Sequence, residues 1–258
     1  MGSGADAPNP ASEVVDFHTV FLSLRYGLTR RINVSATMPY HSIQSDKIQG
    51  APYSRLNRGF GDLLVTAAYR LGTSPQFTLE AGVKFATGNV DKKDDLGQRI
   101  CDILALGSGT NDLVIGAGFW MPHVVVHGLD VTAGLRHRFT SGENKWGYRF
   151  GDQTLYDLHG SHLVGERTRL GLRFDGYHSG RDTWYGNVVP ERGATFVYVG
   201  PTVSYKMSDT MTVGGFARFP LVMRLEGSQM VAPLAFGLEF TTDVSRFVKA
   251  LVPNEGDE

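Results

Sequence analysis

The chain lacks the long hydrophobic run that a transmembrane helix requires. No segment approaches about 18 consecutive apolar residues, and the mean hydropathy is only −0.15. This absence excludes a helical membrane protein. It leaves a membrane protein built from strands open, because such strands carry their apolar residues on alternate positions only.

Cysteine and net charge are also scarce. Cys101 is the only cysteine, which excludes an internal disulfide and c-type haem attachment, and we interpret it as an incidental loop thiol. The 25 basic and 26 acidic residues give a net charge of −1. Because the basic residues are dispersed rather than clustered, we expect no nucleic-acid partner.

Alternation of apolar and polar residues is abundant instead. Apolar residues occupy every second position from Leu63 to Leu71, and the pattern resumes from Phe77 to Phe85 after a turn at 72–75. Successive side chains of a strand point to opposite faces, so each segment has one apolar and one polar face. The segments are about 10–14 residues long, the length of a tilted membrane-crossing strand. The sequence predicts an all-β fold, a transmembrane antiparallel up-and-down β-barrel with a charged lumen.

Eleven strands are visible in the sequence. They are predicted at Val15–Leu28, Ile32–Ser45, Gly59–Leu71, Gln76–Gly88, Asn111–Met121, Leu129–Phe139, Arg149–Val164, Thr168–His178, Thr195–Lys206, Thr210–Arg224 and Val231–Thr242. Short connectors alternate with long ones such as Asp46–Arg58, Asn89–Thr110 and Ser179–Ala194. Bacterial barrels have short periplasmic turns and long outer loops, so the first and last strands both descend to the periplasm.

An odd number of strands cannot close an antiparallel barrel, so we expect twelve, with one ascending strand missing or unrecognised. It was removed before Ala5, comes from another chain, or lies within Gly2–Glu13 or the long first loop. Residues 1–13 are predicted to be a leader and N-terminal segment, 14–243 the barrel and 244–258 a periplasmic tail. Met1–Gly4 has the composition of an artificial leader, and we expect an export signal to have been removed.

Charged residues at strand positions share one parity, which predicts that they face the lumen. A charge facing the bilayer midplane costs about 2–4 kcal/mol for Arg or Lys. Two interpretations stay open: the charges pair and brace the barrel, or they line a conduit that favours anions or dipolar solutes. Trp120 falls on the same parity. The predicted lumen-lining residues are Arg25, Asp62, Arg70, Glu80, Lys84, Asp112, Arg136, Arg138, Arg169, Arg173, Asp175, Arg218, Arg224 and Glu239.

Four segments resemble an outer-membrane family, the putative MetA pathway of phenol degradation. They are Tyr26–Tyr40, Gly59–Leu63, Gly82–Gly88 and Gly107–Asp112. The family commonly has Pro-Thr-Gly where this chain has Ala86-Thr87-Gly88. These motifs are typical of turns and strand entries. The resemblance implies an outer-membrane protein that admits aromatic or other small hydrophobic compounds.

Candidate catalytic and metal sites are weak. His178 and Ser179 are adjacent, so a continuing strand sends them to opposite faces, where they cannot form a nucleophile–base pair. His159 and His162 also face opposite ways, and His123 and His127 stand about 13 Å apart along a strand. We therefore expect no catalytic residues, no metal, no cofactor and no enzymatic activity.

The sequence predicts a protein of the Gram-negative outer membrane, in contact with its lipid, that passes small molecules passively through a narrow charged lumen. Aromatic and hydrophobic solutes are among the candidates. The alternative is a plugged docking barrel with a protein partner at the tail or outer loops. The loop Asn89–Ser108 is either a charged surface hairpin or an inward-folded plug, and Ser179–Ala194 is similar.

Overall fold

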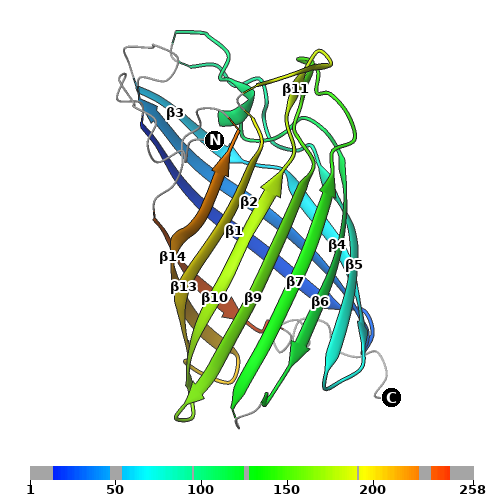
Figure 1. The fold of residues 1–258 in the computed structure, drawn as a ribbon, viewed down its shortest axis with the longest axis vertical. Coiled ribbons are helices and arrows are strands. Elements are labelled where there is room, and N and C mark those ends of the chain that lie inside the picture. The colour runs from blue at the N-terminus through cyan, green and yellow to red at the C-terminus, as the bar shows by residue number, and fades with distance from the viewer. Residues whose placement is uncertain are drawn as a thin grey trace, which may run out of the picture.

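The fold is a single curled antiparallel sheet, seen in a computed structural model that describes residues 14–46, 54–94, 96–124, 128–190, 192–226 and 234–244 (Figure 1). The strand order is β1-β2-β4-β5-β6-β7-β9-β10-β13-β14-β15, with β3 paired to β2. Sequence neighbours are spatial neighbours, as in an up-and-down barrel. The expected all-β antiparallel architecture is confirmed.

Most strands are long enough to cross a bilayer. Their bounds are β1 Val14–Gly27, β2 Ile32–Asp46, β3 Ser54–Phe60, β4 Leu63–Leu71, β5 Gln76–Phe85, β6 Asp112–Met121, β7 Leu129–Phe139, β9 Gln153–Val164, β10 Thr168–Ser179, β13 Ala194–Lys206, β14 Met211–Leu225 and β15 Ala235–Thr242. Three two-residue strands form a separate small sheet, β8 Tyr148–Arg149, β11 Thr183–Trp184 and β12 Asn187–Val188. Among the described residues no helix is long and apolar enough to span a membrane.

The sheet curls most of the way to a closed barrel, with β1 and β15 at its two ends. No ladder joins these two strands within the described ranges. They run in the same direction, so an intervening strand would have to run opposite to both. The twelfth strand stays a prediction, because its expected places, residues 2–13 and the first outer loop, lie outside the described residues, apart from the loop's ends. The predicted N-terminal segment and the predicted tail beyond residue 244 also lie outside the described residues, so both stay predictions.

The third predicted strand, Gly59–Leu71, is wrong as a single element. The chain forms β3 from Ser54 and β4 from Leu63, and both pair with β2. Gly61 and Asp62 interrupt them, and the Gly61 amide donates to the Pro39 carbonyl at 2.8 Å. Two β2 residues oppose three here, so the strand bends in the manner of a β-bulge. The two described ends of the predicted loop, Asp46 and 54–58, are therefore strand.

Short turns and long loops lie at opposite ends of the sheet (Figure 1). In the first turn, Thr29 Oγ1 accepts from the amides of Arg31 at 3.1 Å and Ile32 at 2.9 Å, which holds the chain in a tight reversal. The long connectors, the small sheet and a 3-10 turn, η3 Asp102–Leu104, gather at the other end. The two sets of connectors predicted from their lengths are thus confirmed.

Burial alternates along the strands, as expected if one face of the sheet meets lipid and the other faces the lumen. On β6, Leu113 and Ile115 are 51% and 44% exposed, whereas Asp112 and Val114 are 0% and 2% exposed. Leu113 and Ile115 thus point away from the barrel, whereas Asp112 and Val114 point into it. This outer apolar face is a surface suited to hydrocarbon.

Candidate functional site: the inner face and its outer throat

Paired charges cover much of the inner face. Glu80 on β5 and Arg136 on β7 lie over Gly116 of the strand between them, with Arg136 Nη2 2.9 Å from Glu80 Oε1. Near the end with the short turns, Arg169 Nη1 lies 2.8 Å from Asp130 Oδ2. Each pair links different strands, so the pairs brace the sheet. This geometry agrees with the bracing interpretation of the charges.

The ladders place most of the predicted residues on this face, since directly opposed residues point the same way. Arg25 opposes Ser35, Glu239 opposes Gly214, and Arg70 Nη2 donates to Asn33 Oδ1 at 2.7 Å. Trp120, opposed by Gln76 and Thr132, shares the face of Glu80 and Arg136. The predicted residues whose ladder or ion-pair partners lie on this face are Arg25, Asp62, Arg70, Glu80, Lys84, Asp112, Arg136, Arg138, Arg169, Arg173, Asp175, Arg218 and Glu239.

Arg224 differs from the expected placement. The β13–β14 register shifts between Val197 and Tyr198, and Arg224 then opposes Thr195. Thr195 belongs to the outer face, because it also opposes His178. Strict alternation along β14 cannot reveal this, since one extra residue reverses the parity of everything that follows it.

Two inward carboxylates, Asp130 and Asp157, are not among the predicted lumen-lining residues. Asp130 pairs with Arg169, and Asp157 Oδ2 lies 3.9 Å from Arg173 Nη2. They offset much of the arginine excess that the predicted set of residues contains. The parity of their strands could have found both, because Asp130 is in phase with Arg136.

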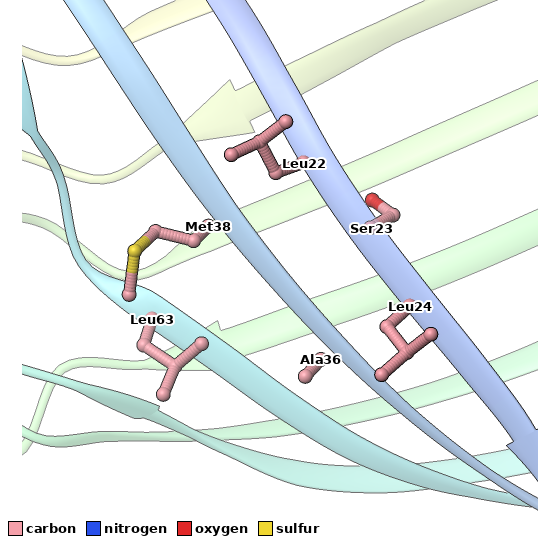
Figure 2. A pocket seen from close by; sticks show the side chains of 6 residues that line it. All are labelled: Leu22, Ser23, Leu24, Ala36, Met38 and Leu63. Atoms are coloured by element: carbon pink, nitrogen blue, oxygen red, sulfur yellow. The ribbon is translucent and has the colours of Figure 1, made fainter. Parts of the chain in front are cut away.

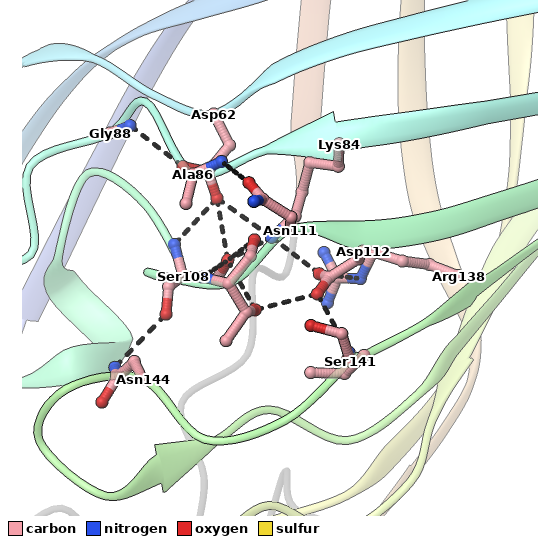
Figure 3. Close-up of polar contacts among 12 residues, drawn as sticks. Asp62, Lys84, Ala86, Gly88, Ser108, Asn111, Asp112, Arg138, Ser141 and Asn144 are labelled. Carbon is pink, nitrogen blue, oxygen red and sulfur yellow. Dashed lines mark hydrogen bonds and ion pairs between the residues drawn. The ribbon is translucent and has the colours of Figure 1, made fainter.

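A buried ionic cluster occupies the outer throat of the barrel (Figure 3). Lys84 Nζ lies 2.7 Å from Asp112 Oδ2 and 3.1 Å from Asp62 Oδ2, and it also donates to Ser108 Oγ. Arg138 Nε is 3.6 Å from Asp112 Oδ2. Two cations thus face two carboxylates, and Asp112 has no exposed surface. A buried charge of this kind is tolerated only when paired.

Both carboxylates also accept hydrogen bonds from the loops. Asp62 Oδ1 accepts from the Gly88 amide at 3.0 Å, and its Oδ2 accepts from the Ser108 amide at 2.8 Å. A Cβ on Gly107 would lie 2.3 Å from Asp62 Oδ1, so only glycine allows this approach. On the other side Asp112 Oδ1 accepts from Thr110 Oγ1 at 2.8 Å. The base of the loop is therefore fixed to the barrel wall.

The throat brings together three segments that are far apart in the sequence and typical of turns and strand entries. Asp62 comes from Gly59–Leu63, Lys84 from Gly82–Gly88, and Ser108 and Asp112 from Gly107–Asp112. Sequence signals were available for this: each motif combines glycine with a charged or hydroxyl residue at the outer end of neighbouring strands.

The loop that follows the throat folds inward. Ile100 and Leu104 pack against Ile43, and all three are 3% exposed. Ile43 opposes Asn57, whose Nδ2 donates to the Leu104 carbonyl at 2.7 Å. Lys93 and Arg99 form an antiparallel bridge, and the Ile100 amide donates to the Lys92 carbonyl at 2.9 Å. The apolar return segment lies against the inner face of β2 and β3. The return segment of the loop is thus folded inward against the barrel wall.

Polar contacts join the outer loops to one another. Asn144 Nδ2 donates to Asp102 Oδ1 at 2.9 Å and to the Ser108 carbonyl at 3.2 Å. Asp182 accepts from the Tyr148 hydroxyl, and desolvation together with this hydrogen bond raises the pKa of Tyr148. The hydrogen bond to Asp102 raises the pKa of Arg99. Both Tyr148 and Arg99 therefore keep their protons at neutral pH.

A shallow apolar hollow lies on the outer, lipid-facing side of the sheet (Figure 2). Leu22, Leu24, Ala36, Met38 and Leu63 line it, with Ser23 at its edge. It adjoins the interruption between β3 and β4. Because its walls belong to the lipid-facing side, it forms no part of the lumen.

His178, Ser179 and His159, which were considered for chemistry, make structural contacts. His178 Nδ1 pairs with Thr195 Oγ1 at 2.9 Å, while Ser179 Oγ donates to the Gly180 carbonyl at 3.1 Å. His159 lies on the inner face and pairs with Thr202. The described residues contain no group of three or more His, Cys, Asp or Glu that could hold a metal ion. His127 lies outside the described residues.

Comparison with known proteins agrees with this architecture. The family described as "Putative MetA-pathway of phenol degradation" matches residues 13–219. No curated protein matches the chain. The crystal structure of the COG4313 outer membrane channel from Pseudomonas putida F1 is similar, with a TM-score of 0.66 and 17% identity over 88% of this chain and 82% of that chain. The resemblance seen in the sequence is confirmed, and the fold is that of an outer-membrane channel.

Proposed function

We propose, because this chain belongs to the family described as "Putative MetA-pathway of phenol degradation", that it is an outer-membrane channel for the passive passage of small molecules. It resides in the outer membrane of a Gram-negative bacterium, with lipid against its apolar face. The observation that carries the proposal is the sidedness of the sheet: exposed Leu113 and Ile115 alternate with buried Asp112 and Val114. Passage down a gradient needs no cofactor and no catalytic residue.

The contacts at the throat bear on which solutes can pass, both by size and by charge. The return segment at Ile100 and Leu104 narrows the outer mouth, so solutes must be small or the loop must move. The inner charges are mostly paired across strands, so we expect weak ion selectivity. The same return segment supports the second candidate, a docking barrel, because a throat that it filled permanently would prevent passage.

Conductance in planar bilayers and solute uptake by reconstituted liposomes test the proposal. Leu104→Asp places a charge against Ile43 and should expel the return segment, which raises conductance several-fold above the native channel. Leu96→Asp is the matched control, because Leu96 is 64% exposed in the same loop. If neither the native protein nor Leu104→Asp gives current or uptake, the channel proposal is wrong and the docking barrel is favoured.

A further inference from the structure

A row of polar side chains crosses the lipid-facing side of β7, β9, β10, β13 and β14, within two residues of their outer ends (Figure 1). Each member directly opposes the next across a ladder, so all of them lie on one face of the sheet. That face is the outer one, because His137 also opposes Ile115, which points away from the barrel. This polar row comprises His137, Thr154, His178, Thr195 and Arg224.

The polar row marks an abrupt change in the lipid-facing surface. The neighbouring row toward the middle of the barrel, the apolar row, holds no charged side chain and comprises Leu135, Tyr156, Gly176, Val197 and Val222. The Tyr156 hydroxyl is satisfied by the Phe196 carbonyl, to which it donates at 2.7 Å. An arginine facing lipid is costly at the bilayer midplane and costs little near the interface. Arg224 therefore places the outer end of β14 at the level of the lipid headgroups.

Polar residues do not line the whole outer rim. At the outer ends of β5 and β6 the lipid-facing residues are Phe85 and Leu113, which are 40% and 51% exposed. Contact with interfacial water alone would not distinguish these two strands from the five that carry the polar row. The polar row is therefore a local patch, which indicates that a particular headgroup contacts it.

The side chains of the polar row present hydrogen-bond donors to the lipid. His178 Nδ1 lies 2.9 Å from Thr195 Oγ1, and His137 Nδ1 lies 2.8 Å from Thr154 Oγ1. An imidazole whose Nδ1 accepts from a threonine hydroxyl carries its hydrogen on Nε2, which is then a donor. Within the described ranges neither Nε2 atom nor the Arg224 guanidinium has a hydrogen-bond or ion-pair partner.

The acidic side chains that follow next along these strands are already paired. Glu226, two residues after Arg224, forms an ion pair with Arg181. Asp152, just before β9, has its Oδ1 3.1 Å from Arg149 Nη2. The polar row thus offers a permanent positive charge and two imidazoles, and charge-assisted hydrogen bonds from such groups to phosphate oxygens are strong.

We propose that the polar row binds the phosphate groups of an outer-leaflet lipid whose acyl chains cover the apolar row. The polar row spans about 19 Å from His137 at one end to Arg224 at the other, so it fits a headgroup that carries two phosphates. Phosphates supply the acceptors that the outward donors need, whereas a choline headgroup would place a cation beside Arg224. The inference goes beyond the channel function, because it depends only on which face of the sheet meets lipid.

Native mass spectrometry of the full chain in detergent tests this, with bisphosphorylated lipid A as the probe. Lipid A should bind saturably, and lipid A without its phosphates should bind about tenfold more weakly, because only the acyl-chain contacts remain. Equal binding of the two lipids would show that the apolar surface alone holds the lipid, which overturns the proposal. Displacement of lipid A by inorganic phosphate would make the polar row a site for free anions and would also contradict a lipid occupant.

Arg224→Gln should weaken lipid A binding about tenfold, and Arg224→Lys, which keeps the charge without the planar fork, should lose less. His178→Leu should act in the same direction and leave the binding of dephosphorylated lipid A unchanged. Arg167→Gln is the matched control, because it removes the same charge from the short turn between β9 and β10. Equal weakening by Arg224→Gln and Arg167→Gln would show that net charge attracts the lipid, which contradicts the polar row. The comparison of the two lipids on the native chain stays decisive if a variant fails to fold.

Discussion

At the scale of single residues, Lys84 holds the ionic cluster of the throat together. Its ammonium group separates two buried carboxylates, Asp62 and Asp112. Lys84→Met would leave them as neighbouring like charges, and removing one partner from a buried ionic group costs about 3–5 kcal/mol. We expect that loss in the free energy of unfolding, measured by urea titration in detergent or lipid.

The control for this prediction lies at the other end of the barrel. Lys206 pairs with Asp209 at the surface, where the two side chains are 51% and 82% exposed. Such pairs contribute about 0–1 kcal/mol, so Lys206→Met should change little. Adding Asp112→Asn to Lys84→Met should restore part of the lost stability. Equal effects of the two lysine substitutions would contradict the role assigned to Lys84.

Cys101 reports on the inward-folded loop. Burial raises the pKa of its thiol, so the folded chain contains less thiolate at a given pH than the unfolded chain. Iodoacetamide at pH about 8 should therefore alkylate Cys101 more slowly in the native protein than in denaturant. Leu104→Asp, which displaces the return segment, should increase the native rate. A native rate equal to that of the unfolded chain would show that the loop does not cover the thiol.

At the scale of elements, the outer loops are joined by contacts that acid should break. Lys145 and the Trp146 indole both donate to Asp91, and the hydrogen bond from Lys145 lowers the pKa of that carboxyl group. A lowered pKa means that the contact contributes stability above the unfolded pKa and loses it as the pH falls through the lower folded value.

Trp146 fluorescence provides the measurement. In a chain whose other tryptophans, Trp120 and Trp184, are replaced by Phe, the emission should stay constant from neutral pH down to about 4 and shift below it. Asp91→Asn should remove that transition. If the emission of the Asn variant still shifts in the same range, another group controls the loop.

The strands themselves show what alternation can predict. It located every strand of the curled sheet except β3, most of which it assigned to a loop, because one face meets water or paired charge and the other is apolar. It missed the break at Gly61-Asp62 and the extra residue in β14 that moves Arg224 outward. Both are single-residue irregularities, and they leave the local composition of the strands unchanged.

At the scale of the whole molecule, the balance of paired charges should determine ion selectivity. Glu80→Gln frees Arg136, so the reversal potential in a KCl gradient should shift toward anion selectivity. Arg136→Gln should shift it toward cations. Arg167→Gln, in a short turn outside the strands, changes the net charge equally and should have little effect. Unchanged selectivity in both inner-face variants would place this pair outside the path of the ions.

The sequence alone determined the strand type, the antiparallel order and the side on which the charges lie, because each follows from a period of two and from connector length. Only the tertiary structure brought three distant glycine motifs together around Lys84 and folded the loop at Leu104 inward. Contacts between residues of different strands depend on register and on irregularities of one residue. A linear pattern of hydrophobicity contains neither.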